Sequence, residues 1–136
     1  MNKKEVLEFL NANRTCHLAT IEEGEPRVRA IGSVKATENG ILFQTWRSKD
    51  LSKQLDQNPV VEFCFNNYDE RVQIRVRGRV EPVEDTAMKE KILAERPQFQ
   101  KFVEGGQEMA IYILKNGSTH VWTFQRNFEP KTFISL

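Results

Sequence analysis

Residues 71–83, RVQIRVRGRVEPV, alternate apolar and polar side chains over most of their length. A period of two is typical of a β-strand with one face on a core and the other face outside it. The apolar face is expected to carry Val72, Ile74 and Val76. The opposite face carries polar side chains, mostly arginines: Arg71, Gln73, Arg75, Arg77 and Arg79. The segment therefore predicts a long, half-buried strand.

Other segments give the same signal. Residues 27–37, RVRAIGSVKAT, predict a second long strand, with Arg27 and Arg29 on one face. Shorter strands are predicted at 15–22, 41–46, 60–65 and in the tail KTFISL. Asn39-Gly40 and Asn116-Gly117 each lie between strand-like runs, which predicts two β-hairpins. Apolar spacing, caps and breakers predict helices over 3–13, 48–57, 84–95 and 98–104.

These elements predict one domain over residues 1–136. Its class is mainly β with flanking helices, and its architecture is an antiparallel barrel or closed sheet with helices packed outside. A net charge of +1 argues against a protein that lives on a nucleic-acid backbone. No apolar run has the length of a membrane helix, and the charged N-terminus does not resemble a secretory signal. Cys16 and Cys64 are interpreted as buried small hydrophobes in a reducing, cytoplasmic setting.

The stretch FQTWRSKDLSKQL, residues 43–55, places two lysines where a strand passes into a helix. Ser48 is the predicted N-cap, and Lys49 and Lys53 lie on one side of the helix, four residues apart. A helix N-terminus binds phosphate through its free N–H groups and its dipole. Solvated surface lysines explain the pattern equally well, and a solvated outer face, an anionic ligand or a polar subunit interface could each explain the two arginine rows.

No glycine-rich loop for a dinucleotide or a nucleoside triphosphate is present. His17 and His120 lie in different predicted strands without the spacing of a metal site, so no metal is expected. His17 is interpreted as a structural or interface residue. The sequence identifies no catalytic side chain.

Five stretches in order carry a resemblance to a known family: HLAT, PRVRAIG, GILFQT, SKDLSKQLDQNPVVEFCF and VQIRVRGRVEPVED. Together they resemble the FMN-binding split-barrel family related to pyridoxamine 5′-phosphate oxidase, over roughly residues 15–90. The resemblance implies a six-stranded antiparallel split β-barrel with flanking helices. It also implies a homodimer that holds FMN in two clefts at the subunit interface.

The resemblance also implies roles for particular residues. Arg29 corresponds to a phosphate-binding arginine, and the next three residues run along the flavin edge: Ala30, Ile31 and Gly32. Two residues match the strand end that meets the flavin ring: Gln44 and Thr45. The phosphate-binding segment is matched by Lys49 at its start and Gln54 in its later part, and Gln73 matches a glutamine near the pyrimidine end of the ring. Trp122 could pack against the flavin or be an ordinary core or interface aromatic residue.

The chain departs from the oxidase in ways that bear on its function. The run Lys49-Asp50-Leu51 stands where the oxidase has Ser-Arg-Lys, so phosphate contacts would be redistributed, with Lys53 as a candidate. No match to the oxidase's C-terminal section is found, and pyridoxamine phosphate oxidase activity is not expected. The resemblance instead implies an FMN-dependent oxidoreductase of a small molecule, with NADH or NADPH as a candidate electron donor.

Two alternatives stay open at the level of sequence. The chain could be a non-catalytic binding or stress protein that holds a flavin, heme or deazaflavin in the same cleft. It could also be a small β-barrel that binds nucleic acid through the arginine face of residues 71–79, although that strand lacks interleaved aromatic residues.

Overall fold

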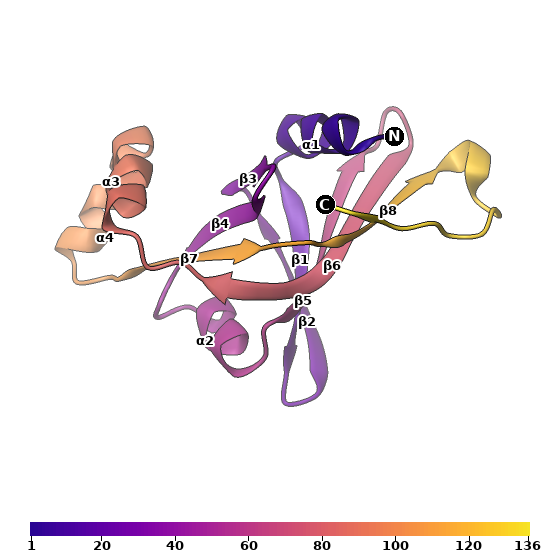
Figure 1. Ribbon diagram of the computed structural model, residues 1–136. Helices are drawn as coiled ribbons and strands as arrows, with labels where there is room; N and C mark the ends of the chain where they lie inside the picture. The colour runs from indigo at the N-terminus through magenta and orange to yellow at the C-terminus, as the bar shows by residue number, and fades with distance from the viewer.

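The computed structural model describes residues 1–136, in which nine strands and four α-helices alternate with short turns (Figure 1). The strands are β1 (Cys16–Glu22), β2 (Glu25–Ile31), β3 (Val34–Thr37), β4 (Gly40–Trp46), β5 (Val60–Asn67), β6 (Val72–Pro82), β7 (Met109–Leu114), β8 (Ser118–Thr123) and β9 (Ile134–Ser135). The helices are α1 (Lys3–Ala12), α2 (Asp50–Gln57), α3 (Thr86–Glu95) and α4 (Gln100–Glu104). Every strand pairing is antiparallel, so the predicted class is confirmed.

The strand order runs β2-β1-β5-β6-β7-β4-β3, and its two ends are consecutive in the chain. The single strand predicted over 27–37 is wrong, because Gly32 and Ser33 interrupt it and divide it into β2 and β3. The alternation of side chains continues through this point in the sequence, which concealed the break. A two-residue link therefore joins the first and last strands of the order. This closes the sheet into a split barrel and raises the strand count above six.

β6 is the strand that both halves of the barrel share. Its first part pairs with β8, from Val72↔Thr123 to Arg77↔Ser118, and its last part pairs with β7, from Val80↔Leu114 to Pro82↔Tyr112. β7 and β8 do not pair with each other, so the hairpin predicted at Asn116-Gly117 is wrong.

The Asn116-Gly117 turn is instead a bulge in one long ribbon that follows β6. Between the pairs at Leu114 and Ser118, three residues face two on β6. The extra residue is accommodated by Asn116, whose φ of 54° is left-handed, a conformation that asparagine tolerates.

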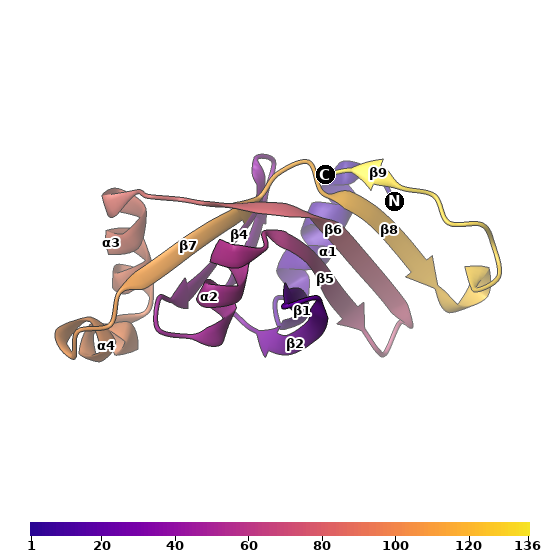
Figure 2. The same ribbon diagram turned by 90° about the horizontal axis from the view of Figure 1, so that it is seen from below.

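Three helices differ in how deeply they pack. α1 begins with an Asn2–Glu5 capping box and buries Val6, Phe9 and Leu10 against the barrel. α2 buries Leu51 and Leu55, as their spacing predicted. α3 has no buried residue, and it projects with α4 from one end of the barrel (Figures 1 and 2). None of the four helices has the length and apolar character needed to cross a bilayer.

The Tyr112 hydroxyl joins β7 to α2 inside the barrel. The ring stacks on Phe43 at 5.6 Å between centroids. The hydroxyl lies 2.7 Å from Ser52 Oγ and donates to Asp56 at 3.1 Å, and Arg47 donates to it at 3.4 Å. Burial raises the pKa of Tyr112, so it stays a neutral donor at physiological pH. This contact fixes the helix whose N-terminus faces the site described below.

We expect Tyr112→Phe to lower the free energy of unfolding by about 1–3 kcal/mol, because the fully buried Ser52 hydroxyl would lose its partner. Urea denaturation measures this loss. Tyr68→Phe, at a position 76% exposed, is the control and should change stability by only a few tenths of a kcal/mol. Equal losses in the two variants would contradict the role assigned to Tyr112.

The two cysteines differ in environment. Cys16 is buried in the core, as predicted, whereas Cys64 is half-buried. Burial, with a smaller contribution from Cys64, raises the pKa of the Cys16 thiol to about 12. Because only the thiolate is nucleophilic, Cys16 should be inert in the folded protein.

This inertness can be tested in a Cys64→Ser variant, in which Cys16 is the remaining thiol. At pH 8 we expect Ellman's reagent to label no thiol in the native protein and one thiol per chain after unfolding in guanidinium chloride. The pKa shift predicts this result because the native thiol is protonated at that pH. Rapid labelling of the native variant would show that Cys16 is neither buried nor protonated as described.

Candidate functional site

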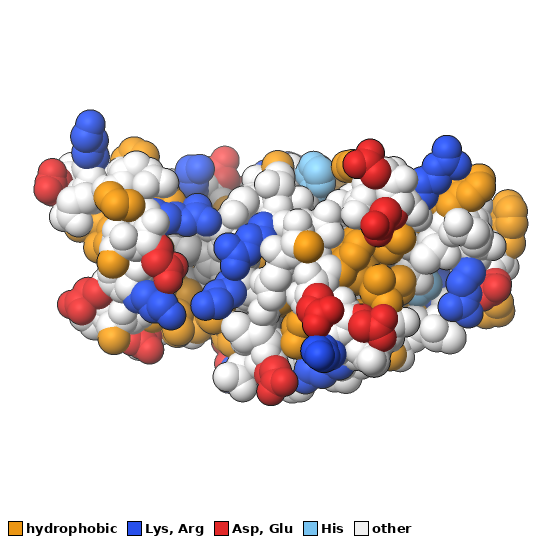
Figure 3. Space-filling view, turned by 90° about the horizontal axis from the view of Figure 1, so that it is seen from above, with side chains coloured by type: hydrophobic (Ala, Val, Ile, Leu, Met, Phe, Trp, Pro, Cys, Tyr) orange, Lys and Arg blue, Asp and Glu red, His pale blue; other side chains and the backbone are white.

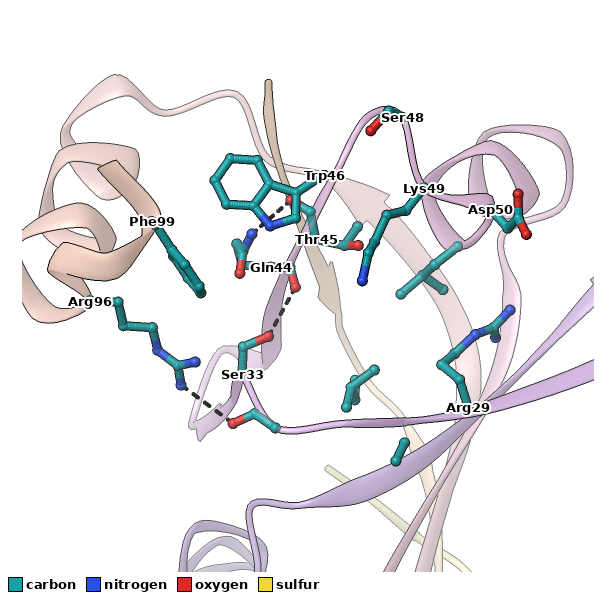
Figure 4. Close-up of a pocket in the computed structure, with 14 residues that line it drawn as sticks. Arg29, Ser33, Gln44, Thr45, Trp46, Ser48, Lys49, Asp50, Arg96 and Phe99 are labelled. Carbon is teal, nitrogen blue, oxygen red and sulfur yellow. Dashed lines mark hydrogen bonds between the residues drawn. The ribbon is translucent and has the colours of Figure 1, made fainter. Parts of the chain in front are cut away.

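An open pocket of about 590 Å³ lies where the β2–β3 link passes the end of β4 and the start of α2 (Figure 4). Its volume is in the range of small-molecule and cofactor sites. It contains seven of the ten residues predicted as cofactor-binding: Arg29, Ala30, Ile31, Gly32, Gln44, Thr45 and Lys49. The fold therefore brings together residues from β2, the link, β4 and the start of α2.

Arg29 is held at the pocket edge by neighbours on β1 and α2. Its Nη1 donates to Leu18 O at 3.1 Å and to Thr20 Oγ1 at 2.7 Å, and its Nη2 donates to Gln54 Oε1. A guanidinium has five N–H donors, so two remain for another partner. Burial lowers the pKa of Arg29, opposed by Asp50 and Glu22, but an arginine stays protonated at physiological pH.

Gln54 does not line the pocket but positions Arg29 from behind. It is buried, accepts from Thr20 at 2.5 Å, and donates to Glu22 Oε2 at 3.2 Å. Sequence reasoning missed Thr20 and Glu22 because only the β1–α2 contact brings them near the arginine. Gln54 therefore acts through Arg29.

The N-terminus of α2 faces the pocket without a side-chain cap. The predicted N-cap, Ser48, is wrong: Lys49 occupies that position, and the Ser48 hydroxyl donates to Gln107 at 2.6 Å instead. The first N–H groups of the helix are therefore left for solvent or a ligand. The Lys49 side chain extends into the middle of the pocket, and the Arg29 guanidinium lies at its edge near Asp50 (Figure 4). This end of the pocket suits an anion.

The opposite end of the pocket is more aromatic. Trp46 and Phe99 meet edge to face, with centroids 5.4 Å apart, and the Arg96 guanidinium lies 5.6 Å from the Phe99 centroid. Arg96 also donates to Gly32 O at 3.4 Å. Sequence reasoning assigned Arg96-Pro97 only to a helix break and Phe99 to a short helix, so their place in the pocket was not predicted.

Three side chains of interest lie outside this pocket. Lys53 is exposed one turn further along α2. Gln73 donates to Asn66 at 3.0 Å and lines a separate polar pocket of about 400 Å³ together with His120 and Trp122. A single chain therefore does not bring Gln73 to Arg29. His17 is exposed on β1, and no group of three His, Cys, Asp or Glu residues could hold a metal ion.

Comparison with known proteins identifies the family. A family model described as pyridoxamine 5′-phosphate oxidase matches residues 3–109. The chain belongs to the pyridoxamine 5′-phosphate oxidase family. The curated pyridoxine/pyridoxamine 5′-phosphate oxidase of Hyphomonas neptunium is 36% identical over 74 residues, which are 54% of this chain and 34% of that protein. The match thus spans about a third of the curated relative.

Solved structures extend the likeness over nearly the whole chain. A NimC/NimA family protein from Clostridium acetobutylicum is 30% identical, with a TM-score of 0.79 over 98% of this chain and 92% of that one. A FAD-binding protein from Mesorhizobium loti is 17% identical, with a TM-score of 0.64 over 88% and 92% of the two chains, and shows the fold alone. The split barrel of these structures is therefore the fold of this chain.

The positioning of Arg29 gives a testable expectation. Gln54→Leu removes the amide that Arg29 and Thr20 share, and we expect the free energy of unfolding to fall by about 1–3 kcal/mol because buried donors lose their acceptor. Chemical denaturation measures the change. Gln57→Leu, at an exposed position on the same helix, is the matched control and should be nearly neutral. Similar stabilities for both variants would refute the positioning role.

Proposed function

We propose that this chain binds FMN in the pocket and acts as a flavin-dependent oxidoreductase of a small molecule. The observation that carries the proposal is the anion-binding end of the pocket. There the uncapped N-terminus of α2, the side chain of Lys49 and the two spare donors of Arg29 line the same pocket. Flavin mononucleotide has a phosphate that suits these cationic and N–H groups and a ring that suits the aromatic side chains of Trp46 and Phe99 at the other end of the pocket.

The donor set fits the cofactor's parts. The phosphate carries up to two negative charges, which match the charges of Arg29 and Lys49 and the helix N–H groups. The ring would lie along Ala30, Ile31 and Gly32, toward the end where Gln44 and Thr45 close the pocket. When bound, the flavin supplies the electron-transfer chemistry, and the chain supplies binding, orientation and electrostatics.

We infer that two copies of the chain complete each site. Gln73 lies in a polar pocket apart from Arg29, so both can contact one flavin only when they come from different copies. The predicted homodimer meets this requirement. Trp122, which shares the polar pocket and donates to Asn127 at 2.9 Å, would then lie near the ring of the partner's flavin.

The proposed reaction is not that of pyridoxamine phosphate oxidase. The oxidase's Ser-Arg-Lys is replaced by Lys49-Asp50-Leu51, of which Leu51 is buried and Asp50 is acidic. We propose instead a small-molecule reductase that takes electrons from NADH or NADPH, with residues 1–136 as its single domain.

The site is compatible with a non-catalytic flavin-binding protein but gives less support to a nucleic-acid binder. A non-catalytic flavin-binding protein would use the same site, and turnover separates it from the oxidoreductase. The arginine face that the nucleic-acid hypothesis depends on makes contacts within the chain. Arg75 lies 3.5 Å from Glu62, Arg71 lies over Phe124, and Arg77 lies over Phe133.

We expect the double variant Arg29→Ala/Lys49→Ala to bind FMN at least about tenfold more weakly, because two charge-assisted contacts to the phosphate are lost. Quenching of FMN fluorescence in a titration measures the affinity. Lys101→Ala, which removes an exposed lysine on α4, is the control and should bind as the original protein does. Lys53→Ala should have a smaller effect than Lys49→Ala, since Lys53 does not line the pocket.

Unchanged affinity in the double variant, with circular dichroism showing an intact fold, would overturn the phosphate assignment. A colourless protein that does not retain added FMN on desalting would overturn FMN binding itself. Bound flavin that neither NADH nor NADPH reduces, with no acceptor found, would favour the non-catalytic alternative.

A further inference from the structure

A second groove lies between α3 and the neighbouring strands β3, β4 and β7. Its volume is about 530 Å³, and its apolar surface comes from both sides. The strands contribute Val34, Leu42, Phe43 and Ile111, and the helix contributes Met88 and Ile92. Figure 3 shows a hollow between the α3–α4 end and the body of the molecule, with Lys and Arg side chains along its sides.

α3 leaves this groove open because it packs only loosely. No residue of α3 is buried, and Met88 and Ile92 are only half-buried, against a small cluster that includes Trp46 and Ile111. Asp85 caps the helix by accepting from Met88 N at 3.1 Å. The helix is thus fixed at its start, and apolar surface stays accessible along its length.

The rim of the groove is basic. Arg14, Lys35 and Lys91 are exposed around it and come from three separate elements of the chain. None of the three makes an ion pair within 4 Å, although seven other basic side chains of this protein do. The carboxylates of the groove are Asp85, which serves as the helix cap, and Glu95. An apolar floor below unpaired cations attracts a ligand with an apolar body and a negative group.

We propose that this groove is a binding site for a small amphipathic organic anion, such as a medium-chain carboxylate, separate from the flavin pocket. The acyl or aryl body lies between Met88, Ile92 and Leu42, and the anionic group lies among Arg14, Lys35 and Lys91. Three residues line both sites and form the divide: Ser33, Gln44 and Arg96. Ser33 donates to Gln44 O at 2.9 Å, and Arg96 donates to Gly32 O, so hydrogen bonds hold the divide together.

The chemistry of the groove distinguishes this ligand from the flavin. The flavin pocket offers a helix N-terminus and a hydrogen-bonded guanidinium to a phosphate, whereas the α3 groove offers an apolar floor below exposed, unpaired cations. The volume falls in the range of small-molecule sites. The proposal does not depend on flavin binding.

Octanoate is the probe, with octylammonium as its matched cationic control. Titrations followed by backbone amide NMR shifts should show saturable shifts in residues 34–35, 42–43 and 88–92 with octanoate and none there with octylammonium. The Lys35→Glu/Lys91→Glu variant should bind octanoate at least about tenfold more weakly, because two attractive charges become repulsive. The variant Lys4→Glu/Lys101→Glu changes the net charge equally at exposed positions outside the groove and should bind normally.

A third variant tests the apolar floor. Ile92→Ser on the loosely packed helix should also weaken octanoate binding, and circular dichroism should show an unchanged fold. Each of three outcomes overturns the proposal: no saturable shifts, shifts confined to the flavin pocket, or equal binding by the groove and control variants. A change of oligomer mass in Lys35→Glu/Lys91→Glu without octanoate binding would show that a second copy covers the groove.

The same variants separate this proposal from the FMN proposal. Arg29→Ala/Lys49→Ala should lose FMN affinity and keep octanoate binding, whereas Lys35→Glu/Lys91→Glu should do the reverse. Failure of FMN binding with intact octanoate binding would remove the proposed function and leave the groove assignment in place.

Discussion

The structure depends on a link of two residues, Gly32 and Ser33, between the strands at opposite ends of the sheet. A sheet whose first and last strands are adjacent in the chain cannot stay open, so this link closes the barrel. It also leaves a gap in the hydrogen-bonded wall, because β2 and β3 follow each other without pairing. The pocket lies at that gap, bounded by the link, the end of β4 and the start of α2. The same link therefore both closes the barrel and forms one side of the pocket.

Electrostatics at the gap depend on contacts made inside the barrel. The Tyr112 hydroxyl fixes α2 through hydrogen bonds with Ser52 and Asp56. Gln54 on the same helix accepts a hydrogen bond from Arg29 and so fixes the guanidinium. Two internal hydrogen-bond networks therefore hold the helix N-terminus and the guanidinium in the wall of one pocket. Because Ser48 is engaged with Gln107, the N–H groups of the helix stay free. Buried polar groups that are fully paired can hold such a geometry with little loss of stability.

Period-two alternation predicted most strands, since inward and outward residues differ in polarity wherever one face is buried. It correctly placed Ile74 and Val76 in the core and Val72 against it, with their neighbours on the other face. It failed at Gly32 and at Asn116-Gly117, because local turn chemistry does not say which strand pairs with which. Seven of the predicted site residues line one pocket. They could be predicted because the family resemblance implied their roles. Arg96 and Phe99 were missed since they reach the pocket from the distant α3–α4 segment, and Thr20 and Glu22 since only tertiary contact reveals them.

The bulge at Asn116 determines which side chains of β8 face the main core. Along β7, the even-numbered residues Ala110, Tyr112 and Leu114 face the main core, whereas along β8 the odd-numbered Thr119 is buried and Val121 packs against that core. One inserted residue thus changes the core-facing positions of this ribbon from even to odd numbers, whereas the core-facing positions of β6 stay even-numbered along its length. Without the inserted residue, His120 and Trp122 would face the main core and leave the polar pocket around Gln73. The bulge therefore exchanges the core-facing and outward-facing positions between β7 and β8, so one continuous ribbon can pack in both halves of the barrel.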